Sequence, residues 1–99
     1  MRLTNEQIQI IKQTAHQLLG NNVRVSLFGS RATDTGKGGD IDLFFETEDS
    51  LPNRAEAICK LYAALIMALG DRKIDVLVKD AQTPPARIFE IAQRTGVYL

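Results

Sequence analysis

This sequence has one cysteine, no excess of charge of either sign and no long apolar run. The lone Cys59 excludes an internal disulfide, and its helical neighbours Ile58, Leu61 and Tyr62 predict a buried structural thiol rather than a nucleophile. A formal net charge of zero supplies no basic field to attract nucleic acid, so we expect no direct nucleic-acid partner. No signal peptide opens the chain and no run spans a bilayer, so we expect a cytoplasmic protein without a membrane partner.

The chain is 99 residues long, which leaves room for a single domain over residues 1–99. Hydrophobic residues make up 44% of it and charged residues 24%, as is typical of a globular protein in water. A domain of this size buries a modest fraction of its surface, and partners or self-association often add to its stability. We therefore expect a homo-oligomer or a hetero-oligomer.

Three stretches predict amphipathic helices. Residues 4–7 (TNEQ) form a capping box that opens the first helix, which ends at Gly20. The second helix runs from about residue 53 to residue 69, and the third follows Pro84-Pro85 and ends at Gly96. The apolar spacing assigns to the core Ile8, Ile11, Ala15, Leu18 and Leu19 in the first helix, Ile58, Leu61, Tyr62, Leu65, Ile66 and Leu69 in the second, and Ile88, Ile91 and Ala92 in the third.

Residues 23–28, 40–45 and 73–78 predict strands, because apolar side chains alternate along each of them. A predicted helix joins the second strand to the third, so these two strands are expected to pair as a βαβ unit. Such a pairing brings Asp75 beside Asp42. On its own, Asp75 would more often be an exposed edge residue, since an aspartate in a short apolar strand is costly unless it is exposed or has a function.

The stretch from residue 29 to residue 43, GSRATDTGKGGDIDL, organises the rest of the chain. Asp40 and Asp42 alternate on one face of a strand, while Ile41 and Leu43 point into a core on the other face. Two carboxylates on one face repel each other unless a cation lies between them. Oxygen ligands beside a glycine-rich turn suit Mg²⁺ that carries a phosphate substrate, so we interpret this stretch as a metal-dependent nucleotide site.

Gly29 and Ser30 form a turn directly after the first strand, where backbone N–H groups and the serine hydroxyl can hold an anion. A plain turn is the alternative interpretation, since both residues are common in turns. The guanidinium of Arg31 either holds a phosphate or pins the acidic strand. If these residues bind an anion, Gly29, Ser30 and Arg31 hold the β- and γ-phosphates of a nucleotide. The negative charge of pyrophosphate is then already neutralised when it leaves.

The three aspartates together predict in-line nucleotidyl transfer. Asp40 and Asp42 would bridge two Mg²⁺ ions that clamp the attacking and leaving oxygens. Asp75 would hold the metal that activates the attacking hydroxyl and would help to accept its proton.

The segments GSRATDTGKGGDIDLFF and KIDVLV resemble the DNA polymerase beta-type nucleotidyltransferase superfamily, above all its minimal nucleotidyltransferases, and the similarity extends to the closing PPARIFEIAQRTGVYL. The resemblance implies an α/β (α+β) fold, a small mixed sheet of three to four strands with helices packed against it. It also implies an antitoxin paired with a HEPN-domain ribonuclease toxin encoded nearby. Some members silence that toxin by transferring AMP from ATP to a tyrosine near its active site.

This chain departs from many relatives at Asp34, where they carry Gly, and at Gly39, where they carry Ser. Neither position supplies a metal ligand, so the departures bear on loop stiffness and on the grip on the nucleotide rather than on the chemistry.

Two other functions compete with adenylylation of a toxin. A non-catalytic antitoxin would neutralise its partner by contact alone, and replacing Asp40 and Asp42 with Asn separates the two, because occlusion survives that change. Nucleotidyl transfer to a small molecule such as an aminoglycoside ranks lower, because relatives with that activity carry a further domain for the drug. The neutral net charge also disfavours RNA as the acceptor.

Overall fold

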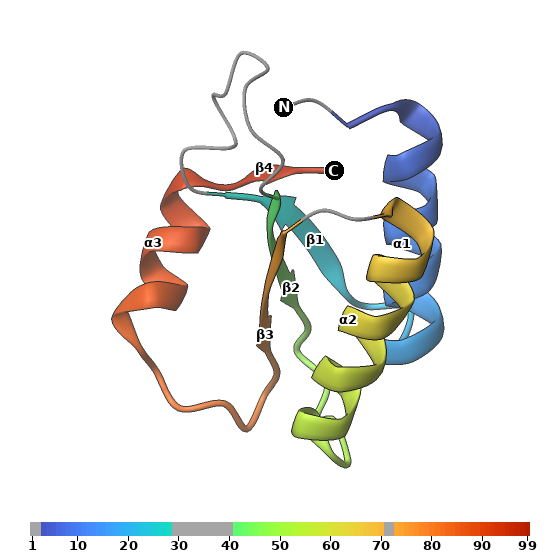
Figure 1. Cartoon of the computed structure of the whole chain (residues 1–99). Helices are drawn as coiled ribbons and strands as arrows, with labels where there is room; N and C mark the ends of the chain where they lie inside the picture. The colour runs from blue at the N-terminus through green and yellow to red at the C-terminus, as the bar shows by residue number, and fades with distance from the viewer. Residues whose placement is uncertain (1–2, 29–40, 71–72) are drawn as a thin grey trace.

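The computed structural model describes residues 3–28, 41–70 and 73–99 of the chain. The elements in this part are, in order, α1 (Asn5–Leu19), β1 (Arg24–Leu27), β2 (Ile41–Glu46), α2 (Arg54–Leu69), β3 (Ile74–Lys79), α3 (Arg87–Thr95) and β4 (Val97–Tyr98). The strands form one sheet in the order β3-β2-β1-β4, in which β2 and β3 are parallel and β1 is antiparallel to both β2 and β4. Figure 1 shows α1 and α2 on one face of the sheet and α3 on the other. The expected small mixed sheet with helices packed against it is confirmed.

The first helix begins and ends as the sequence predicts. Thr4 Oγ1 accepts a hydrogen bond from the N–H of Gln7 at 3.1 Å, and Gln7 Oε1 accepts one from the N–H of Thr4 at 2.8 Å, which completes the capping box. Gly20 ends the helix with a φ of 100°, a left-handed conformation that glycine adopts without strain. Both signals are local in the sequence, which is why the bounds of α1 are predictable.

The main core lies between the sheet and the two helices α1 and α2. Alternate strand residues point into it, and residues three or four apart on each helix complete it. Its buried members are Ile11, Ala15 and Leu19 of α1, Val23 and Val25 at β1, Ile41, Leu43 and Phe45 of β2, Leu61, Leu65 and Leu69 of α2, and Ile74 and Val78 of β3.

Helix α3 covers the opposite face of the sheet through a smaller apolar cluster. The buried members of this cluster are Phe28, Phe44, Phe89 and Ala92, with Leu77 packed against them. The rings of Phe44 and Phe89 have their centroids 6.1 Å apart and are tilted by 30°, a favourable geometry for two aromatic side chains. Strand β2 is therefore held from both sides.

The assignment of Ile88 to the core was wrong. Ile88 is 43% exposed, whereas its neighbour Phe89 is only 6% exposed. Adjacent helical residues point about 100° apart, so only one of the two can face the sheet. The aromatic ring covers more apolar surface than the aliphatic chain, and it meets Phe44 across the layer.

Two residues of α2 also lie outside the core to which the sequence assigned them. Cys59 is exposed, so the prediction of a buried structural thiol was wrong. Tyr62 is 44% exposed. Each follows a core residue by one position, Ile58 and Leu61 respectively, and the helical rotation of about 100° per residue turns it away from the sheet.

The strands deviate from their predicted bounds by one residue. Strand β1 is shorter than residues 23–28 by one residue at each end, while β2 and β3 continue to Glu46 and Lys79. Strand β4 was not placed by the sequence, because two residues are too few to show an alternation. Within the described ranges, no helix is long and apolar enough to cross a membrane.

Candidate active site

Asp42 and Asp75 lie side by side where β2 and β3 begin. They are register partners in the parallel pairing of these strands, which in general lie about 4.8 Å apart. Register partners in a parallel pair point to the same face, so both carboxylates project on the side of α3, opposite the buried Ile41 and Leu43. The predicted juxtaposition of Asp75 with Asp42 is confirmed.

Two backbone hydrogen bonds at this end of the sheet involve the residues directly before and after positions 29–40. Phe28, the residue before that segment, donates its N–H to the carbonyl oxygen of Asp42 at 3.0 Å. Ile41, the residue after the segment, donates its N–H to the carbonyl oxygen of Lys73 at 2.9 Å. Phe28 and Ile41, which flank the positions of the other predicted site residues, are thus hydrogen-bonded to the backbone close to the two carboxylates.

The two carboxylates differ in their access to solvent. Asp75 is exposed on the edge strand β3, and Asp42 is half-buried on the inner strand β2. An aspartate on an edge strand would be exposed even without a function. The feature that distinguishes Asp75 is therefore its register with Asp42. The apolar cluster that holds Phe44 and Leu77 continues along the same face of these strands. The two carboxylates therefore project from a well-packed part of the sheet, and solvent reaches the pair from the side of Asp75.

The donor chemistry of the pair fits the expected metal. Two carboxylates on one face supply hard oxygen ligands, which suit Mg²⁺ better than metals that prefer nitrogen or sulfur. No group of three or more His, Cys, Asp and Glu side chains suited to a metal ion occurs within the described residues. The predicted site residues that lie outside the described residues are Asp40, Gly29, Ser30 and Arg31.

A further buried carboxylate, that of Asp80, was not predicted from the sequence. It is 2% exposed and accepts hydrogen bonds from the N–H of Leu51 at 2.8 Å, the N–H of Gln82 at 3.0 Å and the hydroxyl of Thr83 at 2.7 Å. Burial raises the pKa of Asp80, but the hydrogen bonds outweigh it and hold the pKa below its usual 3.8. Asp80 follows the end of β3 opposite to Asp75, so it ties two loops together and is not part of the pair.

The family model for the nucleotidyltransferase domain matches residues 8–97 of the chain. Among curated proteins, none matches it. Two solved structures of similar fold are a mutant of the toxin-antitoxin MntA-HpeT (24% identity, TM-score 0.64, covering 97% of this chain and 71% of that chain) and a toxin-antitoxin with AMP-PNP (24%, 0.68, 96% and 72%). A third is a tri-AMPylated Shewanella oneidensis HEPN toxin in complex with an MNT antitoxin (23%, 0.56, 92% and 70%). At these identities the likeness shows a shared fold.

Proposed function

Because this chain belongs to the nucleotidyltransferase domain family, we propose that it transfers AMP from ATP to a tyrosine hydroxyl of a HEPN-type toxin and thereby acts as an antitoxin. The observation that carries the proposal is the register of Asp42 with Asp75 on adjacent parallel strands. The choice of partner and of the AMP group is supported by the structures of similar fold, which are toxin-antitoxin complexes, one with AMP-PNP and one with an AMPylated HEPN toxin. Because the proposed reaction consumes ATP, we also propose that the protein is cytoplasmic.

In the proposed reaction, the acceptor oxygen forms a bond to the α-phosphorus of ATP. The bond from that phosphorus to the oxygen bridging the α- and β-phosphates breaks, and pyrophosphate leaves with the bonding electrons. Asp75 takes up the proton of the acceptor hydroxyl, since it is the more exposed of the two carboxylates and is accessible to an incoming chain.

Asp42 and Asp75, together with Asp40, would hold Mg²⁺, two ions in the full proposal. When bound, Mg²⁺ supplies positive charge that offsets the charge developing on the phosphate oxygens. Asp42 is well placed for this role because strand β2 is packed on both faces, which fixes the backbone from which the carboxylate projects.

Gly29, Ser30 and Arg31 would bind the β- and γ-phosphates. Their attachment point supports this role, because Phe28, directly before Gly29, is hydrogen-bonded to the backbone of Asp42. Backbone N–H groups in a turn and a guanidinium are suitable donors for phosphate oxygens.

A partner that closes over the site is part of the proposal. Asp75 lies exposed on an edge strand, so water reaches this side of the pair. Nucleotidyl transfer to an acceptor other than water requires water to be excluded and the acceptor to be oriented. A docked protein that offers its own hydroxyl meets both needs.

The proposal is tested by co-expressing the chain with the HEPN-type protein encoded beside it and measuring the intact mass of that protein. We expect a gain of one or more AMP units, lost in Asp42→Asn and in Asp75→Asn. Glu48→Gln is the matched control, because it removes one exposed carboxylate from the loop after β2 and should leave the gain unchanged.

The double variant Asp40→Asn/Asp42→Asn separates catalysis from occlusion. If the toxin stays unmodified and its toxicity returns, the transferase account is supported. If the wild-type chain adds no AMP and the double variant still suppresses toxicity, the fold serves binding alone and the catalytic proposal is wrong.

A further inference from the structure

Lys73 lies directly before strand β3, at the end of the sheet that carries the carboxylate pair. Its carbonyl oxygen accepts a hydrogen bond from the N–H of Ile41 at 2.9 Å, so the ladder between β2 and β3 includes its backbone. The alternation of side chains along β3 therefore applies to Lys73 as well. Lys73 and Asp75 project to the face of α3, while Ile74 between them is buried in the core on the opposite face.

The charge of Lys73 is available to a ligand. Residues two apart on a strand have their Cα atoms about 7 Å apart, so Lys73 is the neighbour of Asp75 along β3, as Asp42 is its neighbour across the sheet. Lys73 is exposed, and within the described residues it forms no ion pair, not even with these carboxylates. A ligand that reaches the pair can therefore contact the ammonium group without displacing a partner.

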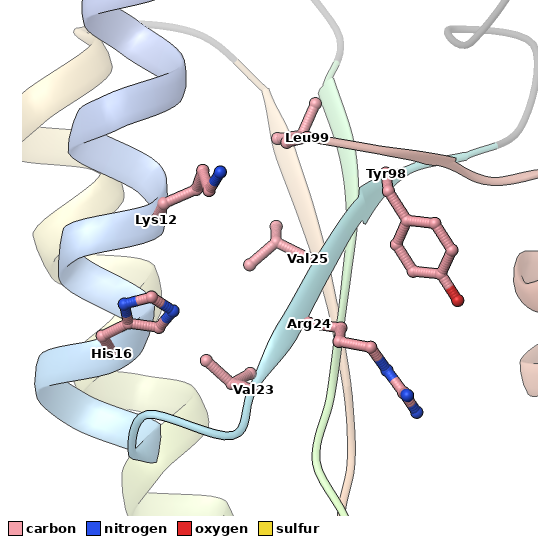
Figure 2. Close-up of a pocket in the computed structure, with 7 residues that line it drawn as sticks. All are labelled: Lys12, His16, Val23, Arg24, Val25, Tyr98 and Leu99. Carbon is pink, nitrogen blue, oxygen red and sulfur yellow. The ribbon is translucent and has the colours of Figure 1, made fainter.

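The other cationic side chains that the described strands present on the face of α3 lie at the opposite end of the sheet. Lys79 is the last residue of β3, six positions beyond Lys73. Arg24 opens β1, and its register partner is Glu46, the last residue of β2. Figure 2 shows the Arg24 side chain pointing away from α1, and it lies 3.6 Å from the carboxylate of Glu46. Neither cation is beside the carboxylate pair.

The two arginines of α3 point away from the sheet. Arg87 and Arg94 each lie two positions from a buried residue, Phe89 and Ala92 respectively, and two helical positions correspond to a rotation of about 200°. Among the described residues, an anionic substrate at the carboxylate pair would therefore meet one neighbouring cation, Lys73. Such a cation offsets the repulsion between the substrate and the two carboxylates.

We propose that Lys73 binds the α-phosphate of the nucleotide, through a charge-assisted hydrogen bond from its ammonium group to a non-bridging oxygen. The inference rests on the proposed transferase function and adds a substrate-binding residue to it. In that function Asp42 and Asp75 hold Mg²⁺ at the reacting α-phosphorus, which makes the α-phosphate the nearest phosphate to Lys73. The transition state carries negative charge on the equatorial oxygens of this phosphorus, so a cation beside it also stabilises the transition state.

The first test is nucleotide binding by the full chain without toxin. The ligand is α,β-methylene ATP, which cannot be cleaved between its α- and β-phosphates, and calorimetry with Mg²⁺ present gives its Kd. Lys73→Met removes the charge at an exposed position and should raise this Kd about tenfold, whereas Lys73→Arg keeps the charge and should raise it about twofold or less. The Kd of AMP, whose single phosphate is the α-phosphate, should rise in Lys73→Met by a similar factor.

Lys79→Met is the matched control, because it removes the same charge from the same strand and the same face at the other end of β3, and it should leave both Kd values unchanged. The second test is transfer to the toxin from ATP labelled at the α-phosphate. Lys73→Met should lower kcat about tenfold or more and leave the KM for the toxin unchanged, since the lost contact is strongest in the transition state. If Lys73→Met lowers the melting temperature severely, Lys73→Gln decides.

An unchanged Kd in Lys73→Met, or an equal loss in Lys79→Met, would overturn the inference. So would a raised KM for the toxin with nucleotide binding intact, because Lys73 would then contact the partner. Weaker binding of the ATP analogue with unchanged binding of AMP would assign Lys73 to the outer phosphates and would also contradict it. Failure of the transferase proposal is distinguishable, because the wild-type chain itself would then label no toxin, whereas failure of the present inference leaves wild-type transfer intact.

Discussion

Asp42 of β2 and Asp75 of β3 stand in register across two parallel strands, with their carboxylates on one face of the sheet. Bringing two negative charges together is unfavourable, and a divalent cation between them relieves the repulsion. We therefore expect millimolar Mg²⁺ to raise the melting temperature by several degrees, because a ligand present at ten times its Kd stabilises the folded state by about 1.4 kcal/mol.

The rise should disappear on addition of EDTA and should be absent in Asp75→Asn, which lacks one charge. Differential scanning fluorimetry at constant ionic strength measures both, with Glu48→Gln retaining the full effect. An equal rise in Asp75→Asn would show that Mg²⁺ stabilises the chain elsewhere.

The buried carboxylate of Asp80 predicts a stability defect far from the pair. In Asp80→Asn, an amide replaces a carboxylate that accepts hydrogen bonds from Leu51, Gln82 and Thr83, and at least one buried donor loses its acceptor. The free energy of unfolding should fall by about 1–3 kcal/mol. Urea denaturation measures the loss, and Asp49→Asn at the surface is the control, with an expected change within about 0.5 kcal/mol. Equal stability of the two variants would contradict the role of Asp80.

The same residue predicts how the defect depends on pH. The folded-state pKa of Asp80 is held below 3.8, so its carboxylate stabilises the fold above that pH, and this stabilisation is lost as pH falls through the lowered pKa. The difference in stability between wild type and Asp80→Asn should therefore be full near neutral pH and should narrow below about pH 4. Melting temperatures of both proteins across that range test the sign. A gap that widens toward acid would mean that the pKa is raised in the folded state.

Helix α3 is attached to the sheet by Phe89 rather than Ile88. Phe89→Ala should lower the free energy of unfolding by about 3–5 kcal/mol, since it removes a buried ring that packs against Phe44. Ile88→Ala, at a side chain that is 43% exposed, should cost under about 1 kcal/mol. Chemical denaturation measures the free energy of unfolding of both variants. A larger loss in Ile88→Ala than in Phe89→Ala would support the assignment of Ile88 to the core.

Gly96 is required where the chain passes from α3 to β4. A Cβ there would lie 2.6 Å from the carbonyl oxygen of Ala92 and 2.9 Å from Ser26 Oγ, closer than real contacts allow. Gly96→Ala should therefore destabilise the protein by about 1–3 kcal/mol, as overpacking does, and should perturb the amides of β4. Adding Ser26→Ala should not restore stability, because the carbonyl contact remains. Full rescue by that second change would show that the side chain alone sets the limit.

The elements that the sequence predicts well are those with local signals. The capping box of Thr4 and Gln7 fixes the start of α1, and the alternation along residues 40–45 orients Ile41 and Leu43 into the core. The position of Asp75 beside Asp42 followed from one topological rule, that two strands joined by a helix pair in parallel. This part of the candidate site was thus predictable without a structure.

The features that the sequence did not predict depend on contacts between distant segments. Periodicity cannot choose between Ile88 and Phe89, because that choice depends on Phe44 in the opposing layer. The burial of Asp80 depends on a donor at Leu51, 29 residues away in the chain. Strand β4 exists because β1 offers an edge, so no pattern within its two residues could reveal it.

The central claim, transfer of AMP by the aspartate site, is tested most directly by incubating the chain with its HEPN-type toxin, Mg²⁺ and ATP labelled at either the α- or the γ-phosphate. The toxin is produced without this chain and with a substitution that inactivates its ribonuclease, so that cells tolerate it and its acceptor is unmodified. The account predicts label on the toxin from α-labelled ATP alone, with a rate reduced about a hundredfold or more by Asp42→Asn and unchanged by Glu48→Gln. Label from γ-labelled ATP, or transfer by Asp42→Asn at the wild-type rate, would contradict it.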